Sequence, residues 1–287
     1  MIKFFTPFIV FMILSYLITK VQRRTSPRNS ARISMAVLLL GAATSLSLLV
    51  HFSIMWLMVL PRVGPILHNI LNNGSEHFGG RSELYFIALV ILVIATIKAM
   101  LLVRSDRQIR RSHCGGLVVV SDSEMFAYAL PGAQDGVVIS QGLVQGLSES
   151  ELDVVLAHEQ AHLDNRHDRW ILVGRICTSF NPLLRHPMSN LRFALERIAD
   201  EAAVGICGNR QYVARTIAKV ALGQSKIDYA LGMASFGVVD RVRDLSYRKK
   251  NDGPLRYVVL GVGLMSLAAL SALQWHHIAL AIATVCV

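Results

Sequence analysis

Four long runs of apolar residues alternate with polar segments along the chain. They cover residues 4–19, 33–60, 84–103 and about 257–287. A helix of about 20 apolar residues, rising 1.5 Å per residue, crosses a hydrocarbon core of about 30 Å. The pattern therefore predicts an α-helical membrane protein with about four transmembrane helices. The first run could instead be a signal peptide, although no small-residue cleavage site follows it.

The polar region at 112–253 has the size of a single domain. It opens with three strand-like segments, GLVVVSDS, MFAYALPG and DGVVIS, which predict a small antiparallel sheet. Two helical patterns follow, and Ser148 with Glu151 gives the first of them a capping box. We therefore expect three spans in 1–111, an α+β domain at 112–253, and a fourth span with a short tail at 254–287.

Basic residues cluster beside the predicted spans and account for the formal net charge of +10. The clusters lie at 20–32, 104–111 and 241–256. The positive-inside rule then predicts an outside N-terminus, a cytoplasmic domain and an outside C-terminus. Because the basic runs adjoin the membrane, we expect them to contact the lipid bilayer and not nucleic acid. The four cysteines have no paired spacing, so neither disulfides nor a cysteine metal site is indicated.

The segment VLAHEQAHLDNRH places three ionisable side chains on the apolar face of the first predicted domain helix. Burying His158, Glu159 and His162 is costly unless a partner such as a metal ion satisfies them. H-E-x-x-H brings both histidines to one zinc ion and leaves the glutamate placed as a general base. A motif this short also occurs by chance, so the interpretation requires a third ligand.

The second helical pattern, SNLRFALERIADEAAVGI, supplies that ligand. The helix is expected to begin after Ser189 or Asn190, and Glu196 and Asp200 then project from one side. Glu196 is predicted to complete the zinc site, and Asp200 to accept a hydrogen bond from the outer nitrogen of a ligating histidine. A glutamate and an aspartate with this spacing would more often face solvent. Because Glu196 and Asp200 follow H-E-x-x-H, the zinc-site interpretation is favoured.

The segments ELDVVLAHEQAHLDNRH, FNPLLR, ERIADEAAV and DRVRDL resemble the antirepressor-type membrane zinc metallopeptidases of family M56, over about residues 112–250. The resemblance implies a cytoplasmic gluzincin domain between the third and fourth spans, with Zn²⁺ as cofactor. It also implies a protein substrate such as a transcriptional repressor. Sensor members continue into an extracellular penicillin-binding domain that this sequence does not contain, so we expect no β-lactam sensing of that kind. Membrane peptidases of family M48 share both motifs and are the alternative.

Other polar residues have weaker assignments. Arg241 in DRVRDL is a candidate for transition-state stabilisation or for a structural ion pair. Tyr212 and Tyr229 are oxyanion candidates on residue type alone. His167 lies more than a turn beyond the motif, which favours a supporting role over ligation.

The sequence thus predicts a zinc-dependent endopeptidase of the bacterial inner membrane, cleaving a repressor-like regulator or a membrane protein. Two alternatives stay open: a non-proteolytic signalling or scaffold protein that keeps the gluzincin fold, and an M48-like quality-control protease. An extended peptide substrate is expected to add to an exposed sheet edge, either MFAYAL or DGVVIS.

Overall fold

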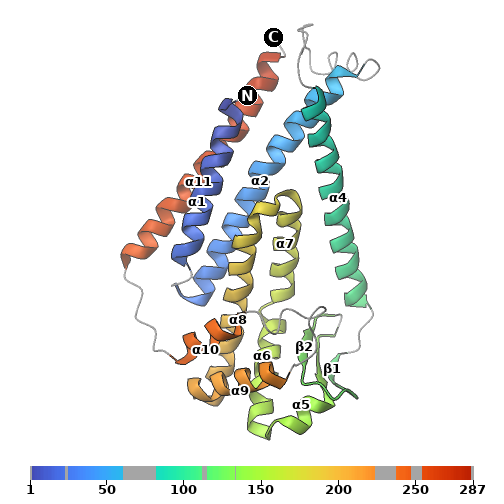
Figure 1. Cartoon of the computed structure of the whole chain (residues 1–287), viewed down its shortest axis with the longest axis vertical. Helices are drawn as coiled ribbons and strands as arrows, with labels where there is room; N and C mark the ends of the chain where they lie inside the picture. The colour runs from blue at the N-terminus through green and yellow to red at the C-terminus, as the bar shows by residue number, and fades with distance from the viewer. Residues whose placement is uncertain are drawn as a thin grey trace.

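The computed structural model describes residues 2–22, 25–60, 82–111, 115–132, 134–223, 237–246 and 254–285, and most of these are helical. Helices α1 (Ile2–Gln22), α2 (Pro27–Val59), α4 (Ser82–Arg111) and α11 (Pro254–Val285) form one end of the molecule (Figure 1). A small sheet and the shorter helices form the other end. Helix α1 begins, and helix α11 ends, at the end of the molecule away from the sheet (Figure 1).

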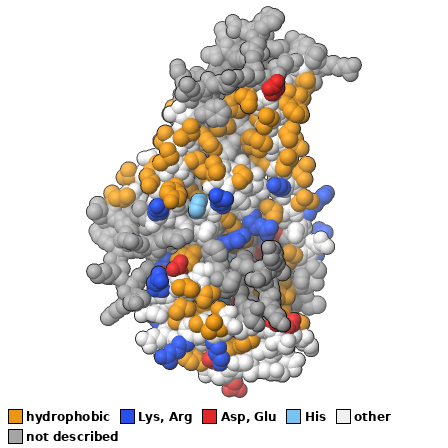
Figure 2. Space-filling view, in the orientation of Figure 1, with side chains coloured by type: hydrophobic (Ala, Val, Ile, Leu, Met, Phe, Trp, Pro, Cys, Tyr) orange, Lys and Arg blue, Asp and Glu red, His pale blue; other side chains and the backbone are white. Residues whose placement is uncertain are grey.

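Three helices of the described chain are long and apolar enough to cross a membrane. Their spans are Pro27–Leu57, Glu83–Arg111 and Tyr257–His276. The expected first span corresponds to α1, whose apolar stretch, Phe8–Lys20, is shorter. The span in α4 is only 11% buried inside the protein, compared with 50% for the span in α2. Apolar side chains therefore cover much of the surface at this end (Figure 2).

Helices α1, α2 and α11 pack through a shared cluster of buried apolar side chains. The cluster contains Phe11, Ile18, Ile33, Val37, Leu260 and Leu267. Polar side chains connect the same helices, because Gln22 Nε2 donates to Ser34 Oγ at 2.8 Å and Thr44 Oγ1 donates to Ser271 Oγ at 3.2 Å. Such bonds hold membrane helices together where apolar burial discriminates little between protein and lipid.

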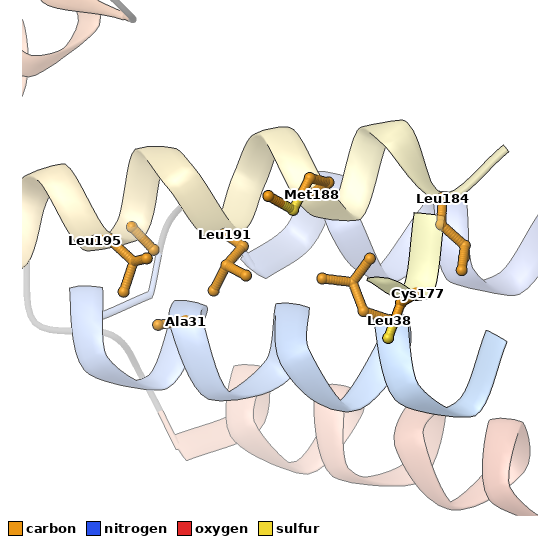
Figure 3. Packing of buried hydrophobic residues seen from close by; sticks show 8 residues of the cluster. Ala31, Leu38, Cys177, Leu184, Met188, Leu191 and Leu195 are labelled. Carbon is orange, nitrogen blue, oxygen red and sulfur yellow. The ribbon is translucent and has the colours of Figure 1, made fainter. Parts of the chain in front are cut away.

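Helices α7 (His167–Phe180) and α8 (Arg185–Cys207) form a hairpin, joined through the short helix η1 (Pro182–Leu184), that inserts beside α2. Leu184, Met188, Leu191 and Leu195 of this hairpin pack against Ala31 and Leu38 of α2 (Figure 3). At its tip, Asn181 Nδ2 donates to Ser45 Oγ of α2 at 2.8 Å. The region at 112–253 therefore shares a core with the membrane helices, and the domain boundary stays a proposal.

The sheet contains β1 (Gly116–Val120), β2 (Ala127–Leu130) and β3 (Gly136–Ser140) in the order β1-β3-β2. Strands β2 and β3 are antiparallel, but β1 and β3 are parallel, so the prediction of an antiparallel sheet is wrong for one pair. The chain reverses direction twice before β3 inserts between the two earlier strands. Because β3 is central and buried, the segment DGVVIS is not an exposed edge, whereas β2 is an edge strand.

The helix that carries the motif, α6 (Glu149–Asp164), begins with the predicted capping box. Ser148 Oγ accepts from the Glu151 backbone N–H, and Glu151 Oε2 accepts from the Ser148 backbone N–H at 2.9 Å. The prediction for α8 was less accurate, because this helix begins at Arg185, before the expected caps. Its Pro187 lies within the first turn, where the missing N–H would have no helical partner. Short helices α5 (Gln141–Gly146), α9 (Arg210–Gly223) and α10 (Val238–Ser246) complete the described part.

Candidate metal centre

Three side chains predicted to bind zinc converge at one point between α6 and α8. The Nε2 atoms of His158 and His162 lie 3.2 Å apart. The carboxylate of Glu196 lies 3.5 Å from Nε2 of His158 and 3.7 Å from Nε2 of His162. The helical spacing i, i+4 aligns the histidines, and α8 crosses α6 so that the carboxylate faces both rings.

This donor set fits a tetrahedral zinc ion. Ligands at about 2.0–2.2 Å from such an ion lie about 3.3–3.6 Å from one another. The three separations found here, 3.2, 3.5 and 3.7 Å, are close to that range. Two imidazole nitrogens and one carboxylate oxygen are also the ligands of many catalytic zinc sites, which keep a fourth position open. In the described part of the chain, no other group of histidine, cysteine or acidic side chains converges in this way.

Asp200 and Arg241 form an ion pair behind the three predicted ligands. Oδ1 of Asp200 lies 3.1 Å from Nδ1 of His158, which is the outer nitrogen of that ring. Arg241, on α10, donates from Nε and Nη2 to the two carboxylate oxygens of Asp200 at 2.9 and 2.6 Å. Its Nη1 lies 2.9 Å from Oε2 of Glu196. The guanidinium of Arg241 thus binds two buried carboxylates. This favours the role of a structural ion-pair partner over that of stabilising the transition state.

His167 contacts His162, the other predicted histidine ligand. Nδ1 of His167 lies 2.8 Å from Nδ1 of His162, the nitrogen that faces away from the convergence point. His167 is the first residue of α7 and is buried. It follows Arg166, whose φ of 51° places the backbone in the left-handed region and turns the chain sharply between α6 and α7. A partner at the outer nitrogen fixes the ring orientation and tautomer of a metal-binding histidine.

The charges around His158, His162 and Glu196 favour a cation between these three side chains. Burial lowers the pKa of His158, but the nearby carboxylates of Asp200 and Glu196 outweigh it and raise the pKa to about 10. Burial and the charge of His158 lower the pKa of His162 to about 3, so this ring stays neutral. A neutral imidazole is the form that binds a metal. The surplus of carboxylates therefore suits a cation held by all three side chains.

Glu159 lies beside this centre and in contact with the sheet. Burial raises the pKa of its carboxyl group, and the charge of His158 and a backbone hydrogen bond from Ala129 of β2 oppose that increase. Glu159 and His158 both line a cavity of about 1000 Å³, whose wall includes the edge strand β2. The carboxylate is therefore accessible to a molecule in the cavity and close to the strand along which a peptide would bind.

The remaining candidates are more distant or lie outside the described residues. Tyr212 does not line the cavity, although it packs against the apolar cluster of Val213 and Leu245, and Val213 does line it. Tyr229 is outside the described residues. Tyr128 of β2, which sequence reasoning did not single out, does line the cavity. Its position in a strand pattern gave no signal, because tyrosine is common in strands for packing reasons alone.

Residues 102–186 match the model of peptidase family M48. The chain is 26% identical over 145 residues to the plastoglobule-localized metallopeptidase 48 of Arabidopsis thaliana, covering 47% of this chain and 41% of the relative. It is 42% identical over 55 residues to a protease HtpX homolog of Pelotomaculum thermopropionicum, covering 19% of this chain and 18% of the relative. No solved structure matches the chain.

The segment that matches the family model, 102–186, includes the H-E-x-x-H motif at 158–162. The chain spans less than half of the length of either relative. The family that matches is M48, the alternative in the sequence analysis, and the comparisons do not show membership of family M56. The matched segment of the family model ends at residue 186, so it does not include Glu196 or Asp200.

Proposed function

We propose that this protein is a zinc-dependent endopeptidase embedded in the bacterial inner membrane, with its catalytic domain in the cytoplasm. The observation that carries the proposal is the convergence of His158, His162 and Glu196, with Glu159 alongside in a cavity bordered by a free strand edge. The similarity of residues 102–186 to a metallopeptidase family supports the same activity.

Each side chain of the centre has a distinct role. Bound zinc supplies Lewis-acid polarisation of a peptide carbonyl and lowers the pKa of water. His158, His162 and Glu196 hold the ion. Glu159 takes a proton from the attacking water and delivers it to the leaving amine. Arg241 holds Asp200 and Glu196 in position and acts through them.

The substrate is proposed to bind as an extended peptide along β2. This strand lines the cavity through residues 127–130, and its outer edge has no strand partner in the described sheet. Backbone hydrogen bonds to such an edge hold a peptide with little dependence on its side chains. A membrane protein substrate is what the M48-like quality-control alternative predicts, and M48 is the family whose model matches residues 102–186. A repressor substrate stays a prediction from the M56 resemblance.

Metal removal tests the proposal. Full-length protein in detergent or nanodiscs should cleave an unfolded model protein, lose that activity after treatment with a chelator, and regain it with one equivalent of zinc. Glu159→Gln should be inactive in the same assay. Glu149→Gln is the matched control, because Glu149 is an exposed glutamate on the same helix. A protein that binds zinc but cleaves nothing in any assay would favour the non-proteolytic alternative.

A further inference from the structure

Three basic side chains line the cavity on the side nearest the membrane helices. Lys98 comes from α4, Arg175 from α7 and Arg192 from α8. Arg192 precedes Glu196 by four residues and so projects from the same face of α8, about 6 Å along the helix axis. One continuous cavity is therefore lined both by the candidate metal centre and by these three cations, of which Arg175 and Arg192 are close enough to repel each other.

In the described part of the chain, no carboxylate forms an ion pair with Lys98, Arg175 or Arg192. Asp106 and Asp168, which line the same cavity, both bind Arg110. Glu196 is bound by Arg241. Nε of Arg192 is buried and has no hydrogen-bond partner among the described residues, and the like charge of Arg175 is nearby. A buried, unpaired donor near a like charge is costly, so an anion bound here would relieve that cost.

The expected depth of the three cations in the bilayer follows from the apolar runs of α2 and α4 that lie beside them. Gly174 packs tightly against Met188, Leu191 and Leu38, so Arg175 is level with Leu38 of α2. Leu38 lies five residues inside the apolar run that begins at Ile33, and Lys98 lies five residues inside the run that ends at Val103. Counted from the ends of these apolar runs at 1.5 Å per residue, both positions are expected about 7 Å inside the hydrocarbon boundary. Long basic side chains at this depth extend their charged ends to the headgroup region.

An apolar surface adjoins the cations. Leu101 of α4 lines the cavity and is 55% exposed, and Ile94 and Ile97 of the same helix are also about half exposed, at 48% and 51%. Basic side chains gather at mid-height of the molecule, below the largely apolar upper half (Figure 2). A ligand with a phosphate at the headgroup level and hydrocarbon above it matches both features.

We propose that Lys98, Arg175 and Arg192 bind the phosphate of an anionic phospholipid whose acyl chains lie along the exposed face of α4. The lipid forms part of the cavity wall above the candidate metal centre. This binding site does not depend on the chain being a peptidase, because neither the cations nor the apolar face belongs to the metal-binding set.

The test compares two pairs of arginines in full-length protein. Arg175→Gln/Arg192→Gln removes two cations from the cavity, and Arg28→Gln/Arg32→Gln removes two exposed cations on α2 that do not line it. Native mass spectrometry in detergent titrated with phosphatidylglycerol should show a loss of affinity of about 10- to 30-fold for the cavity pair. The α2 pair should change by less than about threefold, since surface charges contribute weakly in detergent.

Further variants and competing ligands identify the bound molecule and check that the variants fold. Arg175→Lys/Arg192→Lys should retain most of the binding, and all variants should keep the zinc content and thermal transition of the wild type. Phosphatidylcholine and millimolar inorganic phosphate should compete poorly, because the first lacks net charge and the second lacks acyl chains. Equal losses in both arginine pairs would overturn the proposal. So would displacement of the lipid by inorganic phosphate, or by a peptide with a free C-terminal carboxylate but not by its amide.

Discussion

Arg241 binds Asp200 through two parallel hydrogen bonds, at 2.9 and 2.6 Å, although the two residues are 41 positions apart in the sequence. Both side chains are almost fully buried. Although burial alone would raise the pKa of Asp200, the charge of Arg241 and the contact with His158 lower it to about 2. The pair therefore connects α10 to α8 and keeps a charged carboxylate against the outer nitrogen of a predicted metal ligand.

The first prediction concerns this ion pair. Arg241→Gln leaves the Asp200 carboxylate buried without its partner, which should destabilise the protein by about 3–5 kcal/mol and weaken zinc binding. Arg243→Gln is the matched control, because this arginine lies on the same helix but is exposed. Thermal or denaturant unfolding of both variants measures the difference. Similar unfolding of the two would show that the buried pair contributes little.

The second prediction concerns the contact between His167 and His162. His167→Ala removes the partner of the outer nitrogen of His162, so the zinc affinity should fall by about 10- to 100-fold. His186→Ala, which removes an exposed histidine on α8, should leave the affinity unchanged. Competition with a chromogenic chelator measures both. A zinc affinity in His167→Ala equal to that of the wild type would assign His167 to packing alone.

The third prediction tests the insertion of the α7–α8 hairpin. Cys177 is buried in the cluster between this hairpin and α2. Because the packed hairpin keeps the thiol away from the reagent, a variant that keeps only Cys177 should be labelled slowly by maleimide. Labelling should become fast on unfolding. Rapid labelling of the folded protein would place the hairpin away from the membrane helices.

The fourth prediction concerns orientation. Because basic residues cluster at 20–32, 104–111 and 241–256, a reporter fused near Gly115 should be active in the cytoplasm, and one fused near Gly74 should be active outside. Paired cytoplasmic and periplasmic reporters provide the measurement. The reverse pattern would move the candidate metal centre to the other side of the membrane and exclude a cytoplasmic substrate.

Features set by local sequence were predictable, and features set by long-range packing were not. The i, i+4 spacing of His158 and His162 and the capping box at Ser148 follow from helix geometry within one or two turns. The bidentate pairing of Arg241 required knowledge of where α10 packs. The parallel pairing of β1 with β3 results from the central position of β3. It could not be predicted, because alternation of apolar residues does not specify strand order.

The insertion of α7 and α8 among the membrane helices was also missed. Both helices are amphipathic and contain arginines, so a hydropathy pattern assigns them to a soluble domain. Their polar faces line the cavity, and their apolar faces pack on α2. Neither helix is apolar enough on its own to be recognised as part of a membrane core, because its polar side faces the cavity and not the hydrocarbon.

The central claim is that two chemically identical side chains, Glu159 and Glu196, have different roles in one zinc peptidase centre. Zinc content and cleavage rate measured together in Glu159→Gln and Glu196→Gln test this claim most directly. Glu159→Gln should keep about one zinc ion per chain while cleavage falls by a factor on the order of 10² to 10⁴. Glu196→Gln should lose zinc affinity together with activity. Loss of zinc from Glu159→Gln with retention in Glu196→Gln would contradict the assignment, and normal zinc content and cleavage in both would contradict the metal centre itself.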